Sequence, residues 1–259
     1  EIFDESTTNI FRDTGHVGVE GEKILAQNVF NSILPNIKPN SHASDYEELF
    51  SNVHEKFRIM SEYDFRGEII NKKLFTDMDL QNTVFWFGDL SSVDFINNEM
   101  SDADFTYSSI FNVVLIDNDA NKNKFGRAII SKTTINHNEL NKSDFSGSRI
   151  YDSVFTNNSM VGSIFEGAAI TNSEFNETDL SHSIFKRTEV IDTKFQKIDT
   201  TELKLLHSRF LKVNFDEFDF AKISSNNNSF TACDFSNTNL NEIDNWNHDF
   251  SSKILNNII

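Results

Sequence analysis

Large apolar residues recur at every fifth position of this chain from Phe65 onward. Residues whose numbers are multiples of five are large and apolar as far as Leu255, apart from Ala120, Thr200, Ser225 and Asn245. The register continues without insertion over about 190 residues. A helix repeats every 3.6 residues and a strand every second residue, so neither produces this period. The pattern predicts a tandem repeat in which each pentad contributes one large inward side chain.

A second inward position lies two residues before each large one and holds small residues in most pentads. Examples are Ala103, Ser108, Ser143, Ser148, Ser163 and Thr178. A short asparagine series stands at the same position in every fourth pentad: Asn98, Asn118, Asn138 and Asn158. Stacked amides can hydrogen-bond along the repeat direction and satisfy a turn, so we interpret this series as structural. Cys233 occupies a small inward position and is expected to be an inert, buried thiol.

These pentads resemble the pentapeptide-repeat family. Ala103-Asp104-Phe105-Thr106 and Ser143-Asp144-Phe145-Ser146-Gly147 match the family motif closely. The resemblance covers roughly three quarters of the chain. It implies a mainly β fold, a right-handed quadrilateral parallel β-helix with four pentads per coil.

The choice of apolar residue supports a 20-residue coil independently of the resemblance. Phenylalanine dominates the sites 65, 85, 105, 125, 145, 165 and 185, and also 75, 95, 155, 175, 195, 215 and 235. Branched aliphatics or methionine dominate most of the sites between them. In a four-sided coil, phenylalanine would occupy two opposite sides and keep the volume of each core layer constant. About nine coils, spaced about 4.8 Å apart, would make a rod of roughly 45 Å.

The residue immediately before each large apolar residue is expected to point outward, and one such column is acidic. The acidic column comprises Asp79, Glu99, Asp119, Glu139, Asp179, Asp199 and Asp219, with Ser159 interrupting it. Stacked carboxylates about 4.8 Å apart repel by up to about 1 kcal/mol per pair in water. Three interpretations remain: aspartate that hydrates the rod, an anionic surface for a basic partner, or a row of cation sites. The third is the weakest, because no loop clusters oxygen ligands as calcium loops do.

Several aromatic residues interrupt the outward polar pattern. The aromatic patch comprises Trp86, Phe87, Tyr107 and Phe111, and Phe87 and Tyr107 are expected to stack on adjacent coils. Exposed aromatic clusters often mark partner sites. The alternative is that an amphipathic segment of the same chain covers them.

The sequence predicts two units, an N-terminal cap segment over 1–60 and a repeat rod with a short C-terminal cap over 61–259. Glu22–Leu34 has near-helical apolar spacing and stops at Pro35. Ser44–Glu47 fits a capping box, and one helical face holds Tyr46, Leu49, Phe50, Val53 and Phe57. Such a cap would cover the open end of a β-helix. A bulged loop is expected near 225–229, where serine and asparagine interrupt the apolar series.

Charge and composition narrow the possible functions. The 259 residues include 40 acidic and 23 basic ones, for a net charge of -17. This disfavours nucleic acid and anionic membranes as direct partners and favours a basic protein surface. The single cysteine excludes an intramolecular disulfide. No run approaches the roughly 20 apolar residues of a membrane span. The chain opens at Glu1 rather than Met, so a preceding leader or further domain stays open.

No catalytic motif stands out: there is no Walker A loop, HExxH or GxSxG, and the seven histidines are scattered. We therefore expect no enzyme activity, no cofactor and no metal site. The favoured hypothesis is a protein-binding scaffold, and the Asn, Ile, Lys and Phe bias suits an effector secreted by an AT-rich bacterium into a host cell. The alternative, implied by the resemblance, is a bacterial cytoplasmic DNA mimic. It would bind DNA gyrase or topoisomerase IV, as the quinolone-resistance members do. The resemblance also leaves open a homodimer through the C-terminal end.

Overall fold

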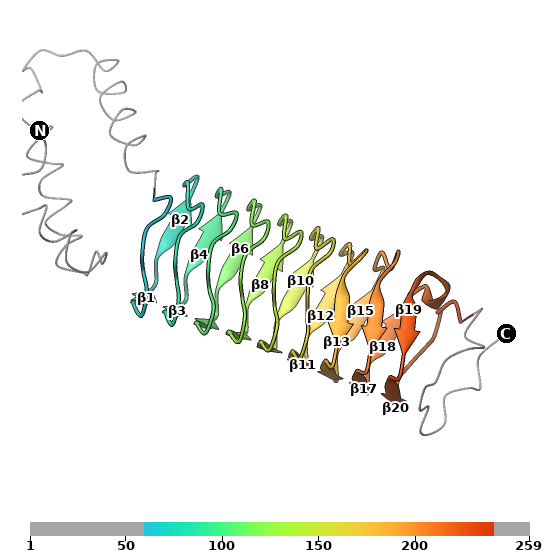
Figure 1. Cartoon of the computed structure of the whole chain (residues 1–259). Helices are drawn as coiled ribbons and strands as arrows, with labels where there is room; N and C mark the ends of the chain where they lie inside the picture. Colours follow the sequence, from blue (N-terminus) through green and yellow to red (C-terminus); the bar gives the residue numbers. More distant parts are fainter. Residues whose placement is uncertain (1–59, 241–259) are drawn as a thin grey trace, which may run out of the picture.

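The computed structural model describes residues 60–240, which form a rod of stacked, four-sided coils (Figure 1). The predicted helical cap, apart from Met60, and the predicted C-terminal cap and dimer contact lie outside the described residues. The described residues form three parallel sheets with no α-helix, which confirms the predicted β-helix of pentapeptide repeats. Neighbouring strands pair residues four pentads apart, for example Ile70 with Leu90, so one coil is four pentads long.

Two sides of the coil carry regular sheets. The side that bears the Ile70 column is a nine-stranded sheet: β1 (Ile69–Asn71), β3 (Asp89–Ser91), β5 (Ser109–Phe111), β7 (Ile129–Ser131), β9 (Arg149–Tyr151), β11 (Ala169–Thr171), β14 (Glu189–Ile191), β17 (Arg209–Leu211) and β20 (Ser229–Thr231). The next side, with the Phe75 column, is an eight-stranded sheet: β2 (Leu74–Thr76), β4 (Asp94–Ile96), β6 (Val114–Ile116), β8 (Thr134–Asn136), β10 (Val154–Thr156), β12 (Glu174–Asn176), β15 (Lys194–Gln196) and β18 (Asn214–Asp216).

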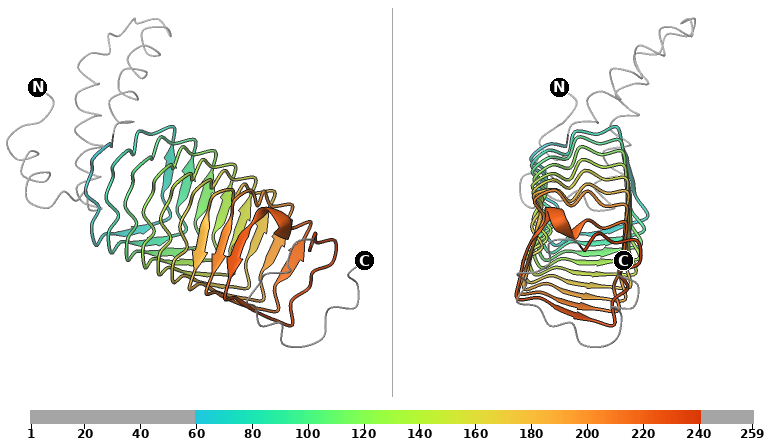
Figure 2. Two further views of the ribbon diagram at one scale, coloured as in Figure 1. Left: turned by 45° about the vertical axis from the view of Figure 1, so that its right-hand side comes forward. Right: turned by 90° about the vertical axis from the view of Figure 1, so that its right-hand side faces the viewer.

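The other two sides are held by turns and single parallel bridges. The Leu80 side carries bridges such as Asp79 with Glu99. The Phe65 side begins with bridges such as Asp64 with Val84 and ends in a three-stranded sheet of β13 (Ile184–Lys186), β16 (Lys204–Leu206) and β19 (Ser224–Asn226). The two views of Figure 2 show that the sides of successive coils lie directly over one another. The rod therefore has four continuous outer surfaces.

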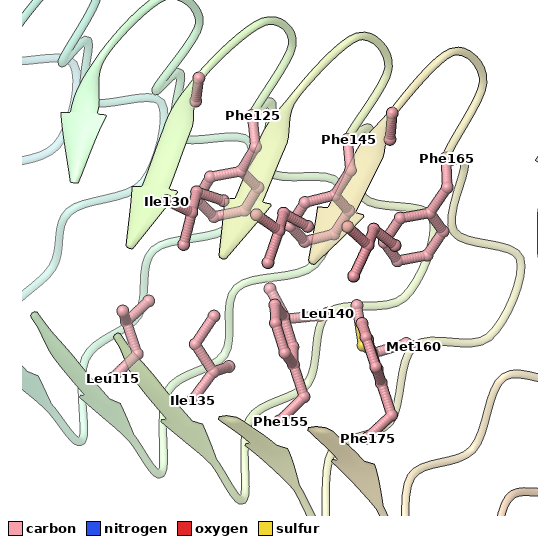
Figure 3. Packing of buried hydrophobic residues seen from close by; sticks show 14 of the residues in the cluster. Leu115, Phe125, Ile130, Ile135, Leu140, Phe145, Phe155, Met160, Phe165 and Phe175 are labelled. Atoms are coloured by element: carbon pink, nitrogen blue, oxygen red, sulfur yellow. The ribbon is translucent and has the colours of Figure 1, made fainter. Parts of the chain in front are cut away.

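Phenylalanine rings fill the core along two opposite sides, as the alternation predicted. Phe125, Phe145 and Phe165 stack with centroid spacings of 4.7 and 4.9 Å. Rings on the facing side meet them edge-on, as Phe155 meets Phe145 at 6.3 Å and 75°. Figure 3 shows Phe125, Phe145 and Phe165 on one side of the interior, facing Phe155 and Phe175 on the other. Offset-stacked and edge-to-face pairs are the favourable geometries of aromatic rings, so each layer supports the next.

Volume is redistributed where the apolar series is interrupted. Thr200 is buried at a central site, and the neighbouring small sites hold Ile198 and Leu203 in place of serine or threonine. One coil later, Phe218 fills a small site and packs on Phe215 at 5.0 Å. A large side chain at a small site therefore compensates for a small one at a large site, as close packing requires.

The inward asparagines form a hydrogen-bonded ladder. Asn98 Nδ2 donates to Asn118 Oδ1 at 2.9 Å, and Asn118 Nδ2 donates to Asn138 Oδ1 at 2.8 Å. Each Nδ2 also donates to a backbone carbonyl, as Asn118 does to Phe95 O at 2.9 Å. The Oδ1 of Asn118 further accepts the backbone N–H of Asn98. These buried amides are fully used inside the core, which confirms their structural interpretation.

Each corner of the coil is turned by a residue in the left-handed region. The residue three before every central residue, from Glu62 to Asn237, has φ near +50 to +70°, except Lys222. Only four of these corners are glycine. None is valine, isoleucine, threonine or proline. A left-handed conformation is most costly for β-branched residues and is closed to proline, so the corners account for this exclusion.

The predicted bulge at 225–229 is wrong. Ser225 lies in β19, in register with Leu205, and Asn228 Nδ2 donates to Leu205 O at 2.7 Å from an inward small site. The irregularity falls earlier, at the 3₁₀ turn η2 (Phe220–Lys222), which Asp219 caps by accepting the Ala221 N–H. A polar side chain can occupy an inward site here because its amide satisfies the coil below it.

Removing one rung of the asparagine ladder should destabilise the rod. Asn138→Ala removes the acceptor of the Asn118 backbone N–H and of one Asn118 Nδ2 proton, and it removes the amide that donates to the Leu115 carbonyl. We expect the free energy of unfolding, measured by urea titration, to fall by about 2–4 kcal/mol. Asn176→Ala, on the outer surface of β12, is the control and should change it by less than about 0.5 kcal/mol. Equal losses in the two variants would show that the ladder contributes nothing special.

The left-handed corners predict that a β-branched residue placed at a corner destabilises the rod. Lys142 has φ of +59° at an exposed corner. Lys142→Ile should lower the free energy of unfolding by about 1–2 kcal/mol, whereas Lys142→Asn should leave it nearly unchanged. Thr134→Ile, at an exposed position of β8, controls for the added apolar surface and should be close to neutral. A neutral Lys142→Ile variant would contradict the role assigned to the corner.

Candidate binding surfaces

The acidic column lies along the Leu80 side of the rod. Parallel bridges align its backbone from Asp79 through Glu99, Asp119, Glu139, Ser159 and Asp179 to Asp199. Asp219 continues the column beyond this bridged run, at the coil interrupted by η2. All members are half-buried or exposed. The bridged run spans six coil steps, or about 29 Å at the spacing of parallel strands.

Most aspartates of the column also build the turn in which they sit. Asp179 Oδ1 accepts the N–H of Ser181 at 2.8 Å, and Asp79 Oδ1 accepts that of Gln81 at 3.1 Å. The same bond recurs on the adjoining Phe65 side of the rod, where Asp104 accepts Thr106 N–H and Asp144 accepts Ser146 N–H. Aspartate before a central residue is therefore favoured locally on the turn-built sides.

Glu99 and Glu139 are not explained in this way. No backbone N–H among the described residues donates to either glutamate carboxylate. Glu139 instead accepts Asn141 Nδ2 at 2.8 Å. A glutamate cannot close the short aspartate turn, yet both keep the line of charge continuous from Asp79 to Glu139. Turn formation thus accounts for the aspartates, and the two glutamates require a different reason.

Cations are rare along the acidic column between Asp79 and Asp199, whereas Asp219, at its end, pairs with Lys222 at 3.4 Å. Several carboxylates on other sides pair with a cation one coil ahead, as Glu189 does with Arg209 at 2.6 Å and Glu166 with Lys186 at 2.9 Å. No ion pair in the described residues involves the column from Asp79 to Asp199. Between residues 77 and 201, the only lysine or arginine on the Leu80 side is Lys197, which pairs with Glu177 at 2.8 Å. The column therefore keeps its negative charge available to a partner.

A shallow depression of about 490 Å³ interrupts the column at its midpoint. Ser159 replaces an acidic residue there, with Glu139 on one side and Asp179 on the other. His137, Asn157 and Glu177 complete its rim with other polar residues. Ser159 Oγ donates to Asn141 Oδ1 at 2.7 Å. Because the serine side chain is short, the depression lies at the one position where the acidic column lacks a carboxylate.

Asp199 is the column member whose titration is shifted. Its carboxylate accepts the hydroxyl of Thr201 at 2.7 Å and the N–H of Thr201 at 2.9 Å. These hydrogen bonds lower the pKa of Asp199, with smaller contributions from the positive charges of Lys222 and His182. The carboxylate is thus held ionised by local donors.

The aromatic patch is divided by the structure. Phe87 and Tyr107 stack at 5.0 Å and 14° on adjacent coils, as predicted, and both are exposed. The Arg127 guanidinium lies 5.3 Å from the Tyr107 ring centroid and donates to the Tyr107 hydroxyl. Trp86 is only half-exposed, and Arg66 lies over its ring at 5.1 Å. These side chains form a ladder at the edge between the Phe65 and Ile70 sides.

Phe111 belongs to a different edge. It ends β5, whereas Tyr107 lies at the corner before that strand, so the two flank opposite edges of the Ile70 side. Lys132 lies over the Phe111 ring at 5.4 Å. The aromatic patch is therefore two surfaces, because Tyr107 and Phe111 lie four residues apart, at the two ends of one side of the coil.

Sequence reasoning missed several exposed aliphatic residues on the two regular sheets. Ile69, Leu74, Ile129 and Val154 are 77%, 59%, 38% and 38% exposed. All stand immediately before a central residue, where the side chain points outward. The five-residue register that located the acidic column could have found them too.

The described residues offer little for catalysis or metal binding. They contain no group of three or more His, Cys, Asp or Glu placed to hold a metal ion. Cys233 is buried, as predicted, and desolvation raises the pKa of its thiol to about 11. No helix in residues 60–240 is long and apolar enough to cross a membrane.

Comparison with known proteins identifies the repeat. A family model described as pentapeptide repeats matches residues 148–187 as eight copies. Full-length QnrB1, a plasmid-mediated fluoroquinolone resistance protein, is 14% identical over 70% of this chain and 91% of its own, with a TM-score of 0.38. HetL from the cyanobacterium Nostoc, involved in regulating heterocyst differentiation, is 12% identical over 75% of this chain and 94% of its own, with a TM-score of 0.29. No curated protein matches the sequence.

The lowered pKa of Asp199 makes a prediction about acid stability. A carboxylate whose pKa is lower in the folded than in the unfolded chain stabilises the fold above its unfolded pKa of about 3.9. This stabilisation is lost as the pH falls through the folded value. Asn keeps the Oδ1 acceptor but does not titrate, so Asp199→Asn should lose less stability than the parent between about pH 5 and pH 2. Urea unfolding at stepped pH measures the difference.

Thr201→Val serves as the partner test, because it removes the hydroxyl donor while keeping the side-chain shape. It should bring the pKa of Asp199 closer to its usual value, seen by NMR titration of the carboxyl carbon. An unchanged titration in this variant would assign the low pKa to another cause.

Proposed function

Because the chain belongs to the pentapeptide-repeat proteins and builds their coil from residue 60 to residue 240, we propose that it is a non-enzymatic, protein-binding scaffold. The acidic column is the docking surface, and the partner is a protein with a basic or groove-like surface. The observation that carries this proposal is that, in the described residues, no column carboxylate from Asp79 to Asp199 forms an ion pair with a cation. Several carboxylates elsewhere on the rod, such as Asp104 and Glu189, are paired with a cation one coil ahead.

The energetics favour a binding role for this arrangement. Neighbouring carboxylates repel by up to about 1 kcal/mol per step, and one backbone hydrogen bond of similar size offsets this only at the aspartates. Glu99 and Glu139 add repulsion without accepting such a backbone hydrogen bond. A basic partner would relieve the repulsion, and the line of charge would steer its approach. The rigid core keeps the charges in place before the partner arrives, so little ordering is needed on binding.

A DNA-mimicking inhibitor or protector of a type II topoisomerase, such as DNA gyrase or topoisomerase IV, is a second candidate. The observation that favours it is the straightness of the charged line on a narrow rod. The bridged column has one site per about 4.8 Å, compared with one phosphate per about 3.4 Å along each strand of B-DNA. A groove that accepts a duplex could therefore accept this edge. In the leading proposal the partner is instead another protein with a basic surface. If the chain is a secreted effector, that partner is a protein of the host cell.

The test compares two variants that each remove four negative charges. The column variant carries Asp119→Asn, Glu139→Gln, Asp179→Asn and Asp199→Asn. The control carries Asp102→Asn, Asp104→Asn, Glu189→Gln and Asp192→Asn, all at carboxylates paired with a cation one coil ahead. The asparagines keep the turn acceptors in both. Immobilised protein is exposed to bacterial and eukaryotic lysates at low and moderate salt, and captured proteins are identified by mass spectrometry.

We expect the column variant to reduce capture of its principal basic partner at least about tenfold, while the control changes it less than about threefold. The column variant should also unfold at a slightly higher temperature in low salt, because repulsion is removed. If the two variants lose capture equally, net charge alone explains the binding, and the proposal is overturned. Inhibition of purified DNA gyrase that disappears only in the column variant would select the DNA mimic over the general scaffold.

A further inference from the structure

The outer surface of the rod is most apolar at its N-terminal end. Ile69, Leu74 and Phe87 are 77%, 59% and 57% exposed, and all lie in the first coil or early in the second. The exposed large apolar side chains farther along the rod are only 38–41% exposed. Side chains of this size rarely stay in water where a neighbouring apolar surface can cover them.

The aromatic ladder is open at the same end. Arg127 covers one end of the Phe87–Tyr107 stack, whereas Gly67 takes the corner before Phe87. Gly67 N–H donates to Trp86 O at 2.8 Å, so the two corners are directly adjacent. A Cβ on Gly67 would meet nothing within 4 Å. The ring face of Phe87 toward the N-terminal end is therefore left without a stacking partner from the corner of the preceding coil.

The first core layer is also less covered than later ones. Phe65, Ile70 and Phe75 are 7–8% exposed, whereas Phe145, Ile150 and Phe155, four coils later, are fully buried. Trp86 adds an unmet hydrogen bond, because its Nε1 is buried with no acceptor among the described residues. The first two coils thus present apolar area and an aromatic face that the preceding corner does not cover, beside a buried donor that has no acceptor among the described residues.

The sequence that enters this end has a complementary pattern. Residues 1–59 precede Met60, where the first coil begins. Within them, Ser44 and Glu47 fit a capping box, and the apolar face from Tyr46 to Phe57 ends three residues before the rod. A helix over these 14 residues would be about 21 Å long and marginal alone, so it needs a surface on which to pack.

Position along the chain, rather than charge, selects this segment. The first coil, residues 60–79, carries five acidic residues against Arg66, Lys72 and Lys73, and the stretch 44–57 is acidic too. The short connection to Met60 limits the reach of a helix over 44–57 to the first coils and raises its effective concentration there.

We propose that residues 44–57 form an amphipathic helix that docks against the first-coil surface, over Ile69 and the open face of Phe87. This places Phe87 and Trp86 in an intramolecular contact and leaves the acidic column, on another side, as the partner surface. The proposal is independent of the proposed function, because column binding is measured at Asp119, Glu139, Asp179 and Asp199.

Hydrogen–deuterium exchange on the full chain tests the contact. In the parent protein, amides of 44–57 should exchange at least about tenfold more slowly than in the isolated peptide of the same sequence. Ile69→Ser with Phe87→Ser should remove most of this protection; serine is compatible with the corner, since Ser92 has φ of +55° at an equivalent site. Ile129→Ser with Phe111→Ser, exposed farther along the rod, is the matched control and should change it less than about twofold. Unchanged exchange of 140–160 confirms an intact rod.

Tryptophan fluorescence gives a reciprocal readout. In a Trp246→Phe background, Trp86 is the only tryptophan. Leu49→Ser with Phe50→Ser should increase acrylamide quenching of Trp86, whereas Asn52→Ser with Glu55→Ser, off the apolar face, should not. Protection of 44–57 that is absent, that survives Ile69→Ser with Phe87→Ser, or that falls on dilution would overturn the proposal. Loss on dilution would assign the surface to a second copy of the chain.

Discussion

Closure of each coil after four pentads is the constraint on which the rest of this molecule depends. Strand pairing joins residues one coil apart, so any residue gained or lost would shift every later side chain to a different side. The left-handed corners make the closure possible, since they redirect the backbone at every fifth residue. Even η2, where the corner at Lys222 is replaced by a 3₁₀ turn, is followed by β19 and β20 in the original register.

The core follows from that closure. Because equivalent residues lie directly above one another, phenylalanine columns stack ring on ring and asparagines share hydrogen bonds over four coils. The same alignment makes the interior sensitive to volume, and Thr200 is tolerated because Ile198 and Leu203 enlarge the neighbouring small sites. A small change in one layer is therefore felt by the layers on both sides of it.

The outer surface is where the coil leaves sequence free to vary, and it is there that function is expressed. Aspartate on the turn-built sides serves the turn as well as the surface, so an acidic column alone would be weak grounds for a binding role. What distinguishes the column is that its carboxylates from Asp79 to Asp199 form no ion pair in the described residues, and that it contains two glutamates. The first-coil apolar surface differs again, since its pattern matches a segment of the same chain rather than a basic partner.

The sequence by itself determined the coil, its length, the opposite phenylalanine columns, the asparagine ladder and the acidic column, because one residue spacing dictates them all. It did not determine the conformation around Ser225 or the separation of Phe111 from Tyr107. Those depend on which inward amide satisfies a neighbouring coil and on where a corner falls. Only the tertiary structure showed which carboxylates are paired with cations, because partners four pentads apart meet only when the coils are stacked.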